Sequence, residues 1–165
     1  MGKLISIEPK KLKPSQDYLK ENTVKFILTC FYENREELLP PVPIVRHDTE
    51  NDVFIAIDGH NLIAIYDLFD KNIDVYVADS AEDELLEKIF TESSREGLES
   101  RKLELKEKYE SVLYEYKKLK RVDINSFSDL RNKYSYLNNE LVAREFYKQH
   151  RKEYINNYLH NITMW

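Results

Sequence analysis

The sequence predicts an α+β fold, in which a small mixed sheet-and-helix domain over residues 1–80 is followed by a long all-helical extension over residues 81–165. In the first half, two apolar runs flank a polar turn and a helical pattern between residues 53 and 77, which is the order strand, turn, helix, strand. The second half has no proline and a single glycine, Gly97, so few residues interrupt its helices.

Shorter patterns complete the predicted sheet domain. Pro40, Pro41 and Pro43 exclude a helix and lead into a strand. Apolar side chains three, four and seven residues apart mark one face of a helix that ends near Tyr32. In chain order, we expect a strand at 4–7, an extended segment at 12–16, a helix from about 17 or 22 to 32, strands at 44–45 and 53–57, a helix at 60–69 and a strand at 73–77.

The extension carries two stretches of apolar side chains at alternating spacings of four and three, which is the pattern of a helical seam. The first seam consists of Leu105, Tyr109, Val112, Tyr116 and Leu119. The second consists of Leu130, Tyr134, Leu137 and Leu141, on a last helix that Ser126 or Ser128 would cap. Two long helices with a short polar break predict an antiparallel helical hairpin, and another helix is expected to begin after Ser80. Two heptads are too short to stand alone, so the hairpin must pack on the first part of the chain, on a second subunit or on another protein through residues 100–160.

Composition limits the classes of function. The net charge is -5 and neither half is basic, so tight non-specific binding to nucleic acid is not expected. One local cluster, Lys117, Lys118, Lys120 and Arg121, is an exception that could touch an acidic partner or be a solvated helix face. Cys30, the single cysteine, lies in an apolar helical pattern and cannot form an internal disulfide, which indicates a reducing compartment. No apolar run approaches the roughly 20 residues of a membrane span, and no signal peptide is evident, so we expect a cytoplasmic protein without a membrane partner.

The turn Asp58-Gly59-His60-Asn61 is the candidate site, because it places polar groups where a helix begins. Unpaired backbone N–H groups and the positive end of the helix dipole favour an anion or phosphate there. His60 is a general base, a metal ligand or a donor to phosphate, or else a helix-start residue that hydrogen-bonds the backbone. Asp58 binds a ribose hydroxyl or Mg²⁺, or caps the helix, and Asn61 donates to phosphate or only occupies the first turn. No metal site is assigned from spacing.

Three segments in this order resemble the ParB/sulfiredoxin-like superfamily over about residues 3–79: Leu12-Lys13-Pro14-Ser15-Gln16, Pro41-Val42-Pro43-Ile44-Val45 and Asp58-Gly59-His60-Asn61-Leu62. The branch most similar in its turn is the putative ParB-like nuclease group, which has an aspartate-x-histidine-histidine-leucine turn. Members of the superfamily hold nucleotides at this turn, CTP in ParB proteins and ATP in sulfiredoxins. The resemblance therefore implies an ATP or CTP cofactor with Mg²⁺. It implies Asp58, Gly59, His60 and Asn61 as the lining of the site, with Ser15 and Gln16 facing it and His60 and Asp58 as the catalytic candidates.

The chain departs from the family pattern at three positions of the turn and its surroundings. Leu62 replaces the arginine that often pairs with phosphate, and His60 stands at the sulfiredoxin cysteine position. Gln16 stands where a serine kinase branch has its catalytic glutamate, and an amide cannot accept the proton of a substrate hydroxyl. The extension does not resemble the helix-turn-helix domain of ParB proteins.

Three functions stay open from the sequence. The first is binding of a nucleotide or other phosphate ligand at the turn, with phosphotransfer or hydrolase activity as a further option. The second is a non-catalytic protein-interaction module that uses the helical hairpin, and the third is a DNA-associated or nuclease-like protein. The sequence does not decide whether the protein is an enzyme.

Overall fold

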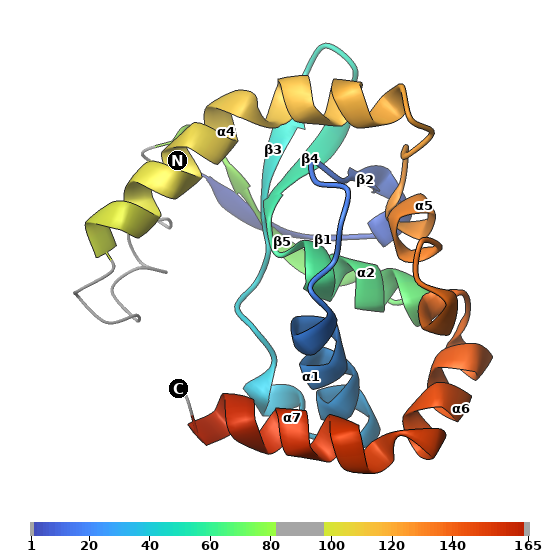
Figure 1. Cartoon of the computed structure of the whole chain (residues 1–165). Coiled ribbons are helices and arrows are strands. Elements are labelled where there is room, and N and C mark those ends of the chain that lie inside the picture. The colour runs from blue at the N-terminus through green and yellow to red at the C-terminus, as the bar shows by residue number, and fades with distance from the viewer. Residues whose placement is uncertain (1, 82–97, 164–165) are drawn as a thin grey trace.

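The computed structural model describes residues 2–81 and 98–163 (Figure 1). The helix expected after Ser80 lies outside the described residues. The strands are β1 (Lys3–Ile7), β2 (Leu12–Lys13), β3 (Ile44–Asp48), β4 (Val53–Asp58) and β5 (Ile73–Ala78). The helices are α1 (Glu21–Tyr32), α2 (His60–Leu68), α4 (Leu98–Lys120), α5 (Phe127–Arg131), α6 (Glu140–Gln149) and α7 (Arg151–Thr163), with short 3-10 turns η1 (Pro9–Lys11), η2 (Glu36–Leu38) and η4 (Ser135–Leu137).

The five strands form one mixed sheet in the order β1-β5-β3-β4-β2. The β1–β5 and β3–β4 pairs are antiparallel, whereas β3–β5 and β2–β4 are parallel. The α+β fold is therefore confirmed, and the predicted strands are present. β3 is longer than the predicted strand at 44–45, because the turn that follows it begins only after Asp48. In that turn Asp52 adopts a φ of 50°.

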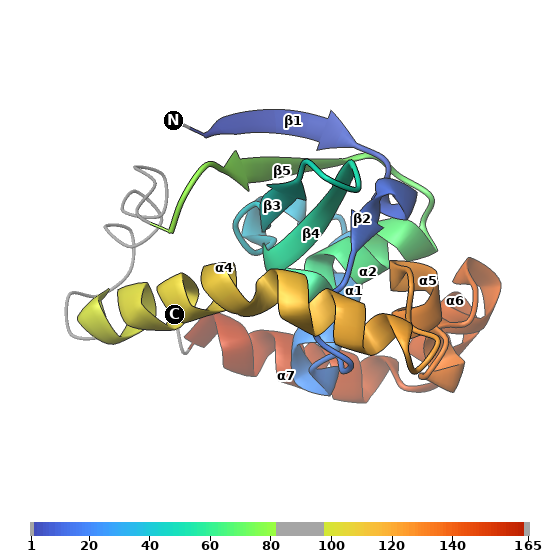
Figure 2. The same cartoon turned by 90° about the horizontal axis from the view of Figure 1, so that it is seen from above.

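Helices cover both faces of the sheet (Figures 1 and 2). On one face, α1 and α2 pack on the sheet, α5 packs on α2, and α7 packs on the outer side of α1. The hydrophobic core on this face joins both halves of the sequence, with members such as Val24 and Ile63 from the first half and Phe127, Leu130 and Tyr154 from the second.

The other face of the sheet is covered by α4 alone among the described helices, and it forms a second, smaller core. Alternate strand residues such as Ile55 and Ile57 point to this face, as the two-residue period of a strand requires. They meet Leu105, Val112 and Tyr116, which belong to the first predicted seam. The seam was expected to pack on the first part of the chain, on a second subunit or on another protein. In the structure it packs on the sheet formed by the first part of the chain.

The helical extension is present, but it is not a hairpin of two long helices. The segment after α4 divides into α5, η4, α6 and α7, because two side chains begin new helices inside it. Ser126 Oγ accepts the N–H of Asp129 at 3.1 Å, and Asn139 Oδ1 accepts the N–H of Val142 at 2.9 Å. The second predicted seam is correspondingly split, since Leu130 and Leu137 are buried whereas Leu141 is 68% exposed.

We expect Val112→Asp to unfold the monomer and not to dissociate an oligomer. The Val112 side chain is 2% exposed against the sheet, so the variant places a carboxylate in an apolar core. The free energy of unfolding should fall by more than about 3 kcal/mol, which urea denaturation measures.

Leu103→Asp is the matched control for this change. Leu103 lies on the same helix and is 59% exposed, so the free energy of unfolding should stay within about 0.5 kcal/mol of the native value. Equal stability of the two variants would contradict the placement of α4 on the sheet.

Candidate functional site

Within the predicted turn, Gly59 is the N-cap of α2 and has a φ of 90°. A Cβ atom at this position would lie 2.6 Å from the Cβ of Pro43. A glycine is required both by the left-handed backbone and by the close approach of the proline that precedes β3. Asp58 ends β4 and is half-buried beside the turn, so the N-cap role weighed for Asp58 belongs to Gly59.

His60 is the first residue of α2 and lies inside the protein, with 3% of its surface exposed. Its Nε2 atom accepts the backbone N–H of Ser15 at 3.0 Å. The Ser15 hydroxyl lies 3.2 Å from the same nitrogen and donates to the carbonyl oxygen of Ala56 at 2.6 Å. Because Nε2 accepts, the neutral ring carries its proton on Nδ1. The ring of Phe127, from α5, covers the imidazole with the ring centres 5.6 Å apart.

Burial lowers the pKa of the His60 imidazole from 6.5 to about 3, and the positive charge of Lys108 adds to this effect. The ring is therefore neutral at pH 7. To act as a general base it would have to release the N–H of Ser15 and then hold a positive charge away from water. The contacts of the imidazole are those of a buried side chain that accepts a backbone hydrogen bond.

The other predicted site residues also form internal hydrogen bonds. Asn61 Oδ1 accepts the backbone N–H of Lys20 at 2.8 Å, and Lys20 is the N-cap of α1. Gln16 Nε2 donates to the carbonyl oxygen of Tyr18 at 2.9 Å, so this amide is turned to its own loop. The fold thus brings Ser15 to His60 as the family resemblance implies. The contacts made by Ser15, His60 and Asn61 connect the segment before α1 to the start of α2.

An ion pair for which the sequence gives no sign connects the extension to α2. Arg131 Nε lies 3.0 Å from Asp67 Oδ2, and Ser128 Oγ donates to that oxygen at 2.8 Å. Arg131 also donates to the carbonyl oxygens of Leu137 and Asn138. No local spacing signals this contact, because its two partners lie more than sixty residues apart. It holds α5 over α2, where Phe127 covers His60.

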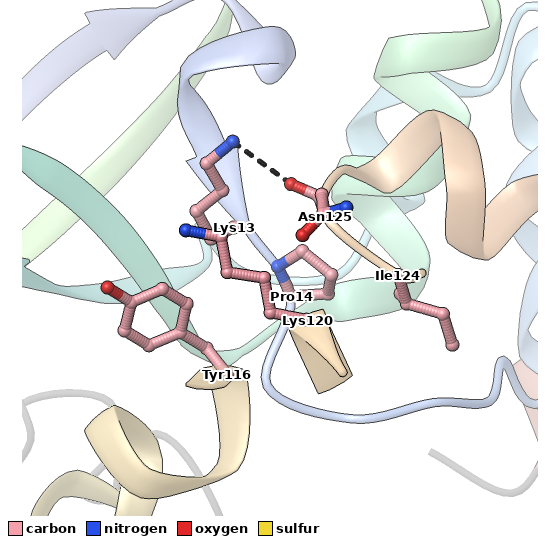
Figure 3. A pocket seen from close by; sticks show the side chains of 6 residues that line it. All are labelled: Lys13, Pro14, Tyr116, Lys120, Ile124 and Asn125. Atoms are coloured by element: carbon pink, nitrogen blue, oxygen red, sulfur yellow. Dashed lines mark hydrogen bonds between the residues drawn. The ribbon is translucent and has the colours of Figure 1, made fainter. Parts of the chain in front are cut away.

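Neither of two pockets on the described surface is lined by the predicted site residues. One, of about 180 Å³, is lined by Leu39, Pro40, Val42, Leu62, Tyr66, Asn72, Ile73 and Asp74. The other, of about 50 Å³, lies between β2 and the end of α4 (Figure 3) and is lined by Lys13, Pro14, Tyr116, Lys120, Ile124 and Asn125. The second pocket brings together two lysines that lie 107 residues apart in the sequence.

Residues 2–81 and 98–163 contain neither a cluster of metal ligands nor a membrane-spanning helix. In this part of the chain, no three or more histidine, cysteine, aspartate or glutamate side chains come together as metal ligands. None of the helices described there combines the length and the apolar character that crossing a lipid bilayer requires.

Comparison of the chain with protein family models, with curated proteins and with solved structures gives no match. The resemblance to the ParB/sulfiredoxin-like superfamily therefore rests on the sequence segments alone and stays a prediction.

Below neutral pH, we expect His60 to make the fold less stable. The folded pKa of about 3 lies below the unfolded value of 6.5, so the unfolded chain takes up a proton as the pH falls while the folded chain does not. Between pH 7 and pH 5 this linkage should lower the free energy of unfolding by about 2 kcal/mol. Urea denaturation at the two pH values measures it.

The control is His60→Gln, in which a carboxamide oxygen can still accept the N–H of Ser15 but nothing titrates. Between pH 7 and pH 5, the free energy of unfolding of this variant should fall by about 2 kcal/mol less than that of the native protein. Identical pH profiles for the two proteins would mean that His60 is not buried as described.

Proposed function

We propose that this chain is a non-catalytic binding module. In it, the Asp58-Gly59-His60-Asn61 turn has a structural role and connects the segment before α1 to the start of α2. The observation that carries the proposal is the hydrogen bond between the Ser15 N–H and His60 Nε2 at 3.0 Å. It occupies the one nitrogen of His60 that could accept a proton. The pKa of about 3 keeps the imidazole uncharged over the physiological pH range.

The surroundings of the turn support the same proposal. Catalysis by His60 with Asp58 would need a substrate to reach both side chains. The imidazole is buried, with Phe127 over it, and the ion pair of Arg131 with Asp67 holds α5 in that position. Opening the site would expose apolar surface and break a buried ion pair, both of which cost free energy.

Binding of ATP or CTP with Mg²⁺ at the turn is the second candidate. The observation that favours it is the start of α2 at Gly59, which has no side chain to cap the first backbone N–H groups of the helix. Asn61 and Lys20 lie next to this helix end. In this alternative the nucleotide is held and not converted, since His60 has no free acceptor. A DNA-associated or nuclease-like role has the least support, because the net charge is -5.

We expect His60→Ala to destabilise the fold. The change leaves the N–H of Ser15 without its acceptor and opens a cavity beneath Phe127, and each effect costs about 1–3 kcal/mol. His60→Gln should lose less, because it keeps an acceptor. His160→Ala, at an exposed position on α7, should lose less than about 0.5 kcal/mol in the same denaturation series. A site histidine would give the reverse, with normal stability after His60→Ala.

We also expect the native protein not to hydrolyse ATP, CTP or GTP, with or without Mg²⁺, above the rate of a blank. Release of inorganic phosphate measures turnover, and a thermal shift measures binding in the same samples. Turnover that is lost in His60→Gln, a variant that stays folded, would overturn the proposal. A thermal shift without turnover that disappears in Asn61→Ala would support the second candidate.

A further inference from the structure

We propose that the pocket between β2 and the C-terminal end of α4 binds a phosphate group. The inference deepens the proposed binding function and rests on it in one respect, since the ligand is held and not converted. The site is separate from the Asp58-Gly59-His60-Asn61 turn.

The pocket is built from three segments that meet only in the folded chain (Figure 3). Lys13 comes from β2, Lys120 from the last turn of α4, and Asn125 from the loop that leads to α5. Pro14 and Ile124 give the pocket an apolar side. Two ammonium groups that border one small pocket are the donors that a phosphate needs, and the low polarity of the apolar side strengthens their attraction for an anion.

Lys13 and Lys120 keep N–H donors that a ligand can use. Lys13 Nζ donates to the backbone carbonyl oxygen of Asn125 at 3.0 Å, which leaves two of its N–H groups for a ligand. No ion pair of the described residues involves Lys13 or Lys120. Two carboxylates contact residues of the pocket wall, and both already accept hydrogen bonds. Asp48 accepts the Tyr116 hydroxyl at 3.1 Å and the Asn51 amide at 2.8 Å, and Asp129 accepts the backbone N–H of Asn125 at 2.9 Å.

The size of the pocket selects the ligand group. Its volume is about 50 Å³. A single water needs about 10–15 Å³ by the same measure, so the pocket has room for the four oxygens of one phosphate and not for a nucleobase. A larger phosphate compound would leave the rest of its structure outside.

The surface beside the pocket would favour such a compound. Lys117 lies three residues before Lys120 on α4, so these two side chains are neighbours on the helix, and Arg121 directly follows the helix end. Neither Lys117 nor Arg121 forms an ion pair with a described residue. Lysines in a last helical turn are expected from the helix dipole alone. The contribution of Lys13 from another element is what distinguishes a site from a solvated helix end.

The test is calorimetric titration of the native protein with inorganic phosphate, pyrophosphate and ATP, without Mg²⁺ and at low ionic strength. Saturable binding of at least one of them is expected. Equal affinity for phosphate and ATP would indicate a free anion, and tighter binding of ATP would indicate a phosphate carried by a larger molecule. Lys120→Gln should weaken binding about tenfold to a hundredfold, the effect of one lost charge-assisted hydrogen bond.

Lys118→Gln is the matched control, because it removes the same charge from the same helical turn. Residues 118 and 120 lie on opposite faces of α4, and Lys118 does not line the pocket. The affinity of the Lys118→Gln variant for the probe should stay within about twofold of the native value, since an exposed charge away from the ligand contributes little.

Three results would overturn the proposal: no saturable binding of any probe, an equal loss in Lys118→Gln and Lys120→Gln, or ATP binding that survives Lys120→Gln and is lost in Asn61→Ala. Phosphate release from ATP is measured in the same samples. Turnover combined with loss of affinity in Lys120→Gln would refute the non-catalytic function and leave the pocket standing.

Discussion

A sheet with two apolar faces must be covered on both, and residues 2–81 supply helices for only one of them. Alternate residues of β4 point to opposite faces, so Ala56 enters the core with α1 and α2 while Ile55 and Ile57 face the other side. Leaving that side in water would expose several large apolar side chains, at about 25 cal/mol per Å² of apolar surface. The position of α4 follows from this requirement, and the path of the chain after α4 follows from the position of α4.

The return of the chain to the first face explains the other contacts of the extension. After α4 crosses the sheet, α5 to α7 pack on α2 and α1, where Phe127 and Tyr154 complete the larger core. Two ion pairs stabilise this packing, each with at least one buried member: Asp67 with Arg131, and Lys25 with Glu153. Breaking such a pair by removal of one partner is costly, because the other charge stays away from water. The two sequence halves therefore share their hydrophobic cores, although their compositions differ.

This arrangement gives the family-like turn its present environment. A turn with the same sequence would expose its polar side chains if nothing lay over the start of α2. Here α5 covers His60, the segment before α1 supplies the N–H of Ser15, and Asn61 caps the backbone at Lys20. The same path brings Lys120 from α4 next to Lys13 from β2. The extension thus covers His60, and it also places Lys120 beside Lys13 at a separate pocket.

The sequence by itself determined the fold class and, to within a few residues, most element boundaries of the first 80 residues. These features depend on local rules: the two-residue period of β4, the helical period of α1, the exclusion of helix by Pro40, Pro41 and Pro43, and the cap at Ser126. The family resemblance implied in addition that Ser15 faces the turn, and in the structure its N–H contacts His60.

Only the tertiary structure decided which surface each element meets. The seam from Leu105 to Leu119 has the same spacing whether it packs on a helix, on a second subunit or on a sheet, so periodicity could not choose among them. The role of His60 depends on Phe127 and Ser15, which lie 67 and 45 residues away in the sequence, and burial by such distant residues sets its pKa. Asp67–Arg131 and Lys13–Lys120 are likewise long-range pairs. Their members look like ordinary surface charges in the sequence, because the burial and proximity that give a charge its function arise only when the chain folds.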